Sequence, residues 1–246
     1  MSLIPKSHPR AKSLYIREKL VHGFDAGLVA KEGLMAHGRG EAFDYLLGEK
    51  TTKHAQKAIA AAAVMLVNAK YPVISVNGNV AALIPREIVK LSKIIPAKIE
   101  VNLFYSNEKR RKNIVNALKK AGAREVLGTN PKNSRRISGL DSARRIVDSN
   151  GIYKADVVLV PLEDGDRTIA LKKAGKKVIT FDLNPLSRTA KTADVTIVDN
   201  IVRAINLLIV QCRSKKIKKI PYNNKKNLAQ IVLDIKKNLS RRMPHA

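Results

Sequence analysis

The sequence predicts an α/β fold, in which helices flank a mostly parallel sheet, with a helical N-terminal region and a basic helical C-terminal tail. Short apolar runs rich in valine and isoleucine, typical of buried parallel strands, begin at Val73, Ile99, Val157, Val178 and Val195. Stretches of helical character separate these runs. Each run stops at polar residues, and such sheets bind ligands beyond the carboxyl ends of their strands. We therefore expect one binding site built from several loops.

The elements are expected in a simple order along the chain. Residues 9–47 are predicted to be mostly helical, with helices at 13–20 and 41–47 and interruptions at Gly33 and at residues 37–40, where glycines break the pattern. The alanine-rich residues 51–70 are predicted to form one buried helix. The strands are expected at 73–76, 99–104, 125–127, 157–160, 178–181 and 195–198, and further helices at 86–94, 108–121, 167–173 and 201–212. Residues 130–149 are predicted as a loop with a weak helix.

The length and composition indicate a folded protein with one main domain. The chain has 246 residues, of which 45% are hydrophobic and 27% charged, so it can bury a substantial core. We expect a single α/β domain over residues 1–220, with a helical part over about 1–70 and the sheet core over about 71–212. A basic helical tail follows at 221–246. Apolar residues recur in the tail at helical spacing, so one face is expected to dock on the body. They are Leu228, Ile231, Val232, Ile235 and Leu239.

Cysteine usage and the absence of long apolar runs predict a cytoplasmic protein. Cys212 is the single cysteine, which excludes an internal disulfide and favours a reducing compartment. We interpret it as a packing residue at the end of an apolar helix. No apolar run approaches the length of a membrane span, and the first residues lack the apolar core of a signal peptide. We expect no membrane partner.

The formal charge of +27 would attract polyphosphates, acidic metabolites and nucleic acid alike. Eleven basic residues and one acidic residue lie between Arg213 and the C-terminus, so +10 of the total lies in the last 34 residues. Only 4% of the residues are aromatic and there is no tryptophan, which disfavours a base-stacking surface. Nucleic-acid binding is therefore less favoured than the binding of a polyphosphate or an acidic metabolite. A basic composition without any such partner is favoured at least as much as either.

The sequence His37-Gly38-Arg39-Gly40-Glu41 places a guanidinium between two glycines. At the start of a helix, such a turn would let backbone N–H groups and the arginine approach an anion. The alternative is a simple connection between two helices, and the sequence favours neither interpretation.

Two polar clusters follow the strands at Val73 and Val157. Asn77-Gly78-Asn79 combines a glycine with two amides, which fits either ligand binding or a tight turn. In the second cluster, Glu163, Asp164 and Asp166 could hold Mg²⁺ directly or through water, and Arg167 could pair with a phosphate. The alternative is that Asp166 caps the following helix.

Residues 182–189 form the most specific stretch of the chain. Asp182, at a strand end, is placed to bind a ribose hydroxyl, and Asn184 can contact a base edge or a second hydroxyl. Arg188 and Thr189 can meet a phosphate, and Asp199-Asn200 repeats the arrangement after the next strand. Together these residues predict a nucleotide site. The glycine patterns of dinucleotide-binding and P-loop proteins are absent.

Several long motifs match a known family. They are IPKSHPR (4–10), residues 13–15 and 17–19, AHGRGEAFDYL (36–46), PVISVNGNVAAL (72–83), ADVVLVPLEDGDRT (155–168), and residues 182–188 and 197–204. The chain closely resembles the archaeal 4-phosphopantoate:beta-alanine ligases, also called phosphopantothenate synthetases. The likeness runs from about residue 4 to 204. It fades over residues 110–149 and after Arg213, so no residue role is carried over there.

The resemblance implies a Rossmann-like, homodimeric, ATP-dependent ligase of coenzyme A biosynthesis. It would join (R)-4-phosphopantoate to beta-alanine, giving 4'-phosphopantothenate, AMP and diphosphate through an acyl adenylate. The implied ATP contacts are Arg17, Arg39, Asp182, Leu183, Asn184, Arg188, Thr189, Asn200 and Ile201. The alternative is a basic α/β protein that binds nucleotide or nucleic acid without ligase activity.

The chemistry of that reaction assigns roles to several candidates. Bringing a carboxylate to the α-phosphate requires positive charge, which Arg17, Arg39 and Arg188 would supply, with Mg²⁺ as a shared counter-charge. The amine of beta-alanine must lose protons, and His37 or Glu41 could accept one, although a structural hydrogen bond is the simpler role for His37. We assign Asn77, Asn79 and Arg167 to phosphopantoate from their strand-end positions alone. The sequence does not identify the metal ligands.

Overall fold

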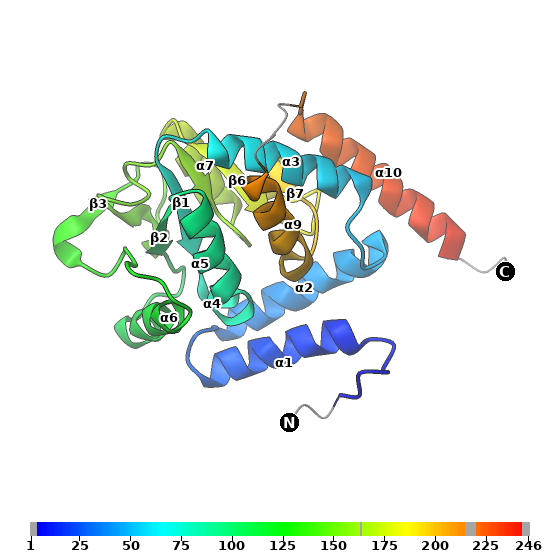
Figure 1. Ribbon diagram of the computed structural model, residues 1–246, viewed down its shortest axis with the longest axis horizontal. Helices are drawn as coiled ribbons and strands as arrows, with labels where there is room; N and C mark the ends of the chain where they lie inside the picture. Colours follow the sequence, from blue (N-terminus) through cyan, green and yellow to red (C-terminus); the bar gives the residue numbers. More distant parts are fainter. Residues whose placement is uncertain (1–3, 163, 215–219, 243–246) are drawn as a thin grey trace.

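The computed structural model, which describes residues 4–162, 164–214 and 220–242, has a central five-stranded parallel sheet (Figure 1). Its strands are β1 (Pro72–Val76), β2 (Lys98–Val101), β5 (Val157–Leu159), β6 (Lys177–Phe181) and β7 (Val195–Ile197). They lie in the order β2-β1-β5-β6-β7, and every neighbouring pair is parallel. The predicted α/β fold is confirmed. The strand expected at 125–127 is reduced to one bridge, between Leu127 and Glu100.

Helices cover both faces of the sheet because the strands are apolar on both sides. One face packs on α3 (Lys53–Val67), α5 (Pro85–Ile94), α6 (Glu108–Lys120) and α9 (Ile201–Arg213). The opposite face packs on α7 (Gly165–Lys173) and on Ala193, which follows α8 (Arg188–Thr192). Alternate residues serve the two faces: in β1, Ile74 belongs to the first core cluster and Val73 to the second.

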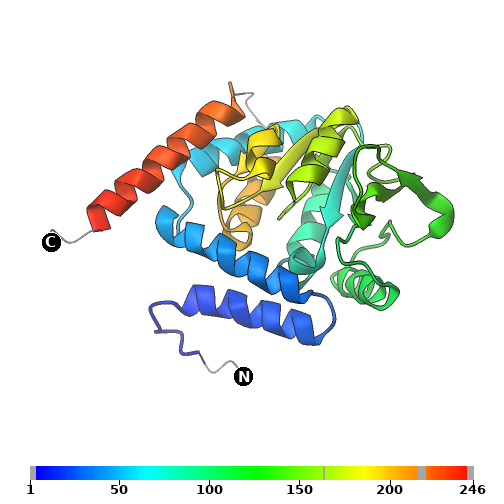
Figure 2. The same cartoon turned by 180° about the vertical axis from the view of Figure 1, so that it is seen from behind.

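The N-terminal region forms two long helices, α1 (Ala11–Asp25) and α2 (Lys31–Leu47), which lie side by side in both views (Figures 1 and 2). The predicted interruptions at Gly33 and at residues 37–40 are wrong, since α2 runs through both. Glycine weakens a helix by only about 1 kcal/mol relative to alanine, and the packing of α2 on the sheet edge outweighs that cost.

The prediction of a loop and weak helix at 130–149 is also wrong in part. The segment contains two short 3-10 helices, η1 (Pro131–Asn133) and η2 (Ala143–Arg145), and an antiparallel pair, β3 (Ser134–Arg136) and β4 (Ile146–Asp148). The pairing is anchored from outside, because the buried carboxylate of Glu100 accepts hydrogen bonds from the backbone N–H groups of Asp148 and Ile152. Such a long-range contact leaves no local pattern in the sequence.

The basic tail forms α10 (Asn224–Arg242), which packs against α2 and α3. Its Leu228 and Ile231 are buried with Leu47 and Leu183, and Ile235 packs beside them. The expected docking of one helical face is therefore confirmed, whereas Leu239 stays exposed. Among the helices of the described residues, none is long and apolar enough to cross a membrane.

Candidate active site

The strand order changes direction between β1 and β5. From β1 the chain goes outward to β2 and later returns to β5 on the other side. In open parallel sheets this switch point leaves a crevice beyond the carboxyl ends of the strands, where ligands bind. The polar residues predicted to form the site follow these strand ends.

Helix α2 lies across this edge of the sheet and contacts the ends of three strands. The Gly33 carbonyl accepts a 2.8 Å hydrogen bond from Asn79 Nδ2, beyond β1. Gly40 faces Leu183, beyond β6. Asp44 accepts a 3.2 Å hydrogen bond from Asn200 Nδ2, beyond β7. Residues 33, 37, 40 and 44 share one helical face, so His37 belongs to the face turned toward the sheet.

The position of Arg39 inside α2 corrects its predicted setting. The glycines that flank it do not form a turn at the start of a helix, because α2 begins at Lys31, and their N–H groups belong to the helix interior. Arg39 is exposed and lies near Asp182. Burial raises the pKa of Asp182, while hydrogen bonds from Ser187 and Asn184 and the charge of Arg39 partly offset that rise.

Glu41 forms an ion pair with Arg17 of α1, at 2.9 Å from Nε to Oε2. Burial acts to raise the pKa of Glu41, but the hydrogen bonds from Arg17 and Tyr45 outweigh it, and the pKa ends below its ordinary value. His37 differs: burial lowers its pKa, although the charge of Glu41 opposes the shift. At neutral pH Glu41 is therefore an ionised partner of Arg17, and His37 is a neutral imidazole.

The loop after β6 is a compact polar turn. The Asp182 carboxylate accepts hydrogen bonds from the Asn184 N–H at 2.9 Å and from the Ser187 hydroxyl. The hydroxyl of Ser187 also caps α8 by accepting from Ala190 N. Arg188, the first residue of α8, forms an exposed ion pair of 2.9 Å with Asp166 of α7, and Thr189 is buried behind it.

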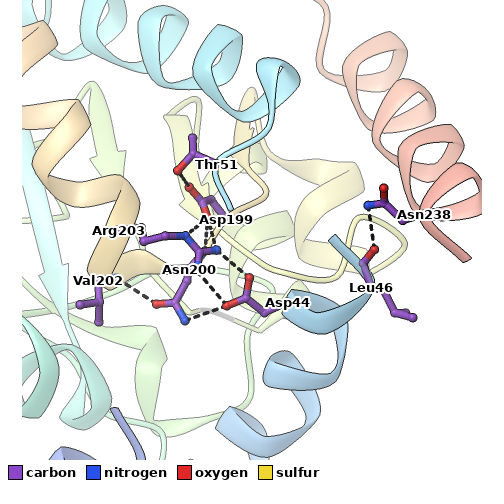
Figure 3. A network of polar contacts seen from close by, with 8 residues as sticks. All are labelled: Asp44, Leu46, Thr51, Asp199, Asn200, Val202, Arg203 and Asn238. Carbon is purple, nitrogen blue, oxygen red and sulfur yellow. Dashed lines mark hydrogen bonds and ion pairs between the residues drawn. The ribbon is translucent and has the colours of Figure 1, made fainter. Parts of the chain in front are cut away.

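The loop after β7 is held by a buried charge network (Figure 3). Arg203 Nη2 lies 2.6 Å from Asp44 Oδ1 and 2.5 Å from Asp199 Oδ1, and Thr51 donates to Asp199 at 2.6 Å. Asn200 caps α9 by accepting from Val202 N, and its amide donates to Asp44. The Asn200 side chain is thus engaged within the protein, and Ile201, the first residue of α9, is buried.

A second group of cations lies beyond β1, β2 and β5. Arg144 Nη1 donates to Asp164 Oδ2 at 3.0 Å, and the fully buried Arg167 donates to Ser75 at 3.1 Å. Asp164, rather than the predicted Asp166, caps α7 by accepting from Arg167 N. A capping residue lies directly before the helix, which is the position of Asp164 and not of Asp166. The Asp164 side chain therefore contacts both Arg144 and the backbone of Arg167.

The side-chain amides of Asn77 and Asn79 donate hydrogen bonds to backbone carbonyls of neighbouring segments. Asn77 donates to the carbonyls of Pro161 and Leu162 and caps α4 (Gly78–Leu83) through Val80 N. Asn79 is occupied by Gly33, as described above. Both side chains lie at the predicted edge, with their N–H donors directed at protein carbonyls.

Of the three carboxylates proposed for Mg²⁺, the structure describes Asp164 and Asp166. Asp164 and Asp166 are each paired with an arginine, and Glu163 lies outside the described residues. In the described ranges, no three His, Cys, Asp or Glu side chains gather where they could hold a metal ion.

Sequence reasoning missed the contacts of Asp44, Arg203 and Arg144. Asp44 lies within a matched motif, but its contact with Arg203 spans 159 positions. Arg144 belongs to a run of basic residues in which buried and solvated arginines look alike. In a continuous helix, Gly40 and Asp44 lie on the same face, which would have placed Asp44 toward the sheet. The predicted helix break at residues 37–40 hid this signal.

Comparison with known proteins gives a consistent result. The family model described as phosphopantothenate/pantothenate synthetase matches residues 54–242. A protein of Thermococcus kodakarensis named 4-phosphopantoate--beta-alanine ligase is 54% identical over 97% of this chain and 94% of its own length. A protein of the same name from Methanosarcina mazei is 50% identical over 97% of this chain and 96% of its own. A third, from Methanospirillum hungatei, is 53% identical over 82% of each.

Proposed function

We propose, because the chain belongs to the phosphopantothenate/pantothenate synthetase family, that it is a ligase forming the C–N bond between 4-phosphopantoate and beta-alanine. The reaction consumes ATP and releases AMP and diphosphate through an acyl adenylate, and the product is 4'-phosphopantothenate of coenzyme A biosynthesis. A nucleotide-binding or nucleic-acid-binding protein without ligase activity is not favoured.

One observation supports this function most strongly. Asp164, the residue before α7, pairs with Arg144, and Asp166, in the first turn of α7, pairs with Arg188. Two cationic groups therefore flank the start of α7. Such an arrangement suits a reaction that brings two anionic substrates together, since each needs its own counter-charge.

The nucleotide is proposed to occupy the side of β6 and β7. Asp182 and Asn184 would bind the ribose, Leu183 would pack on the nucleoside, and Thr189, Asn200 and Ile201 would line the site. Arg17, Arg39 and Arg188 would offset the charge of the phosphates. In the first step a carboxylate oxygen of the acid attacks the α-phosphorus, its bond to the diphosphate oxygen breaks, and diphosphate leaves.

In the second step the amine nitrogen of beta-alanine attacks the acyl carbon and AMP leaves with the bonding electrons. The amine must give up a proton, and we propose His37 rather than Glu41 as its acceptor. Burial keeps His37 neutral, whereas Glu41 is an ionised partner of Arg17. A neutral imidazole can accept a proton near neutral pH. Asn77 and Asn79 would act on the phosphopantoate site indirectly, by holding the backbone carbonyls to which their amides donate.

Three further expectations accompany the ligase function. Mg²⁺ would arrive bound to the phosphates of ATP, because Asp164 and Asp166 are paired with arginines and Mg²⁺ commonly binds through substrate phosphates. The enzyme would be a homodimer, and Leu207 and Val210 on α9 offer exposed apolar area. It would act in the cytoplasm.

The function can be tested by measuring AMP formation with ATP, Mg²⁺, 4-phosphopantoate and beta-alanine, omitting each in turn. A ligase forms AMP and phosphopantothenate only when all the substrates are present. ATP binding without AMP release would instead indicate a nucleotide sensor. Salt-sensitive binding of duplex or single strands without turnover would indicate a nucleic-acid-binding protein.

A further inference from the structure

We propose that a cavity at the end of β2 binds beta-alanine, with Asn102 holding its amine and Arg111 its carboxylate. The site rests on the proposed ligase function, for which it would hold the second substrate. The cavity has a volume of about 130 Å³, and its walls come from the end of β2, the loop after Leu127, β3 and β4. Both β3 and α6 lie beside the β2 edge of the sheet in the two views (Figures 1 and 2).

The buried side chain of Asn102 offers the cavity a hydrogen-bond acceptor. Asn102 is 4% exposed, and its Nδ2 donates to the carbonyls of Ile146 at 2.8 Å and Arg144 at 3.4 Å. Two carbonyls can face only the N–H end of the amide, so these contacts fix its orientation. Within the described ranges no group donates to Oδ1. A buried acceptor without a donor is costly, so a ligand with an N–H group would stabilise this site.

Two side chains of opposite charge line the same cavity. Asp148 is 3% exposed, and its carboxylate accepts from the N–H groups of Gly128 at 3.1 Å and Asn150 at 2.9 Å. An ionised carboxylate has about four lone-pair sites, so it can also accept from a ligand. Arg111 of α6 donates to Ser106 Oγ at 2.8 Å. Because a guanidinium carries several N–H donors, it can bind a carboxylate at the same time.

This combination of groups fits a small zwitterion. An anion alone would meet the acceptor oxygens of Asn102 and Asp148, and a cation alone would leave the charge of Arg111 uncompensated. A metal ion is disfavoured, because among the described residues one carboxylate lines the cavity and hard cations need several oxygen ligands. An amino acid carries both charges, so its ammonium can donate to the two acceptors while its carboxylate accepts from the arginine.

The size of the cavity selects beta-alanine among the three substrates. A cavity of about 150 Å³ admits benzene, which has as many non-hydrogen atoms as beta-alanine. The volume at the end of β2 is close to that value, at about 130 Å³. Phosphopantoate and ATP have more than twice as many non-hydrogen atoms and do not fit.

The cavity lies beside the place where the acid is expected. The backbone N–H of Asn102 donates to the Val76 carbonyl at 3.0 Å, so the end of β2 adjoins the end of β1. Ala143 lines the cavity, and the next residue, Arg144, pairs with Asp164 before α7. ATP is proposed to bind at the other side, beyond β6 and β7. The acid would lie between them, with ATP on one side and the amine on the other.

The positions of the two binding residues give beta-alanine a direction. Asn102 is buried at the strand end, whereas Arg111 is partly exposed on α6. The amine would therefore lie on the inner side, nearest the acid, and the carboxylate on the outer side. Asn102 orients the amine for its attack on the acyl carbon and takes no proton from it. The proton passes to the base, for which His37 is proposed above.

The test measures the two steps of the reaction separately. Exchange of labelled diphosphate into ATP in the presence of 4-phosphopantoate measures adenylate formation without beta-alanine, and the KM for beta-alanine reports on the second step. Asn102→Ala and Arg111→Gln should each raise this KM about 10- to 100-fold, the scale of a lost hydrogen bond to a charged group. Diphosphate exchange should stay at the wild-type rate. Arg111→Lys, which keeps the charge, should restore part of the affinity.

Helix α6 offers two matched controls outside the cavity. Asn113→Ala removes an amide that donates to the Ala26 carbonyl at 3.1 Å, as Asn102→Ala removes one that donates to carbonyls beside the cavity. Lys119→Gln removes an exposed positive charge from the same helix as Arg111. The KM for beta-alanine should be unchanged in both.

An unchanged KM for beta-alanine in either folded variant would overturn the site and leave the ligase function intact, with the cavity holding water only. Equal losses in diphosphate exchange and in amide formation would also overturn it. Arg111→Gln decides the matter if Asn102→Ala does not fold. If wild type forms no product, the ligase function fails, and calorimetry with beta-alanine tests the site by itself. Binding that is weakened in Arg111→Gln supports the site, and an absence of binding refutes it.

Discussion

A hydrogen bond between Gly33 and Asn79 joins α2 to the segment that follows β1. The Asn79 amide donates to the Gly33 carbonyl at 2.8 Å, and a Cβ at Gly33 would lie 2.4 Å from Asn79 Oδ1. The contact needs glycine because the helix backbone approaches a buried amide closely. Because α2 carries His37, Arg39 and Glu41, this pair helps to position the proposed catalytic groups.

Two glycine substitutions in α2 should have opposite effects. Gly33→Ala should destabilise the protein by about 1–3 kcal/mol, since the new methyl group collides with Asn79. Gly38→Ala meets nothing within 4 Å and should stabilise by up to about 1 kcal/mol, because alanine favours the helix. Urea unfolding of both variants measures the difference. Destabilisation by Gly38→Ala would contradict a continuous α2.

Arg39→Ala should lower ligase turnover by about two to three orders of magnitude, the usual scale for losing a charged transition-state contact. Its side chain is exposed, so the fold should be unaffected. The measurement is AMP formation at saturating substrates, with Lys31→Ala at the start of the same helix as control. Near-normal turnover in folded Arg39→Ala would remove this residue from the mechanism.

Arg203→Met should destabilise the protein by about 3–5 kcal/mol, because two buried carboxylates would lose their shared cation. Asp44 and Asp199 are 6% and 1% exposed in this network. Chemical denaturation gives the free energy of unfolding. Arg213→Met, at the exposed end of the same helix, should change it by less than about 0.5 kcal/mol. A similar loss in both variants would show that the network is not the cause.

The pH dependence of amide formation should identify His37. Its pKa is lowered from 6.5 by burial, so the imidazole is neutral and able to accept a proton at pH 6.5 and above, and activity should fall as the pH decreases below that value. In His37→Asn this acid limb should disappear and the rate at neutral pH should drop. The rate with beta-alanine is measured from pH 5 to 8, and an unchanged acid limb in His37→Asn would rule out this role.

Glu100 should make wild type less stable as the pH rises. Burial raises the pKa of Glu100 from 4.5 to about 7, so its folded state binds a proton more tightly than its unfolded state. Its contribution is complete below pH 4.5 and is lost as the pH rises through 7, by about 3 kcal/mol. Glutamine cannot ionise, so the stability of Glu100→Gln relative to wild type should increase over this range. Parallel curves from unfolding at each pH would exclude the effect.

The sequence predicted the sheet because its information is local. The apolar runs at Val73, Val157, Val178 and Val195 each carry enough β-branched residues to define a buried strand, and the helices between them carry their own periodicity. The polar residues after each run were placed at one edge by a general property of parallel sheets. For the same reason Asp182 and Arg188 could be proposed as site residues before their contacts were known.

The tertiary structure alone decided which of these residues meet. Arg203 joins Asp44 across 159 positions, and Glu100 anchors β4 across 48. The glycines of α2 suggested a broken helix, but packing against Asn79 and Leu183 overrides that local preference. Arg144 is buried whereas Arg135 and Arg136 of β3 are exposed, and this difference depends on how distant segments fold together. Strand patterns are set by neighbours in the chain, whereas buried charge is set by neighbours in space.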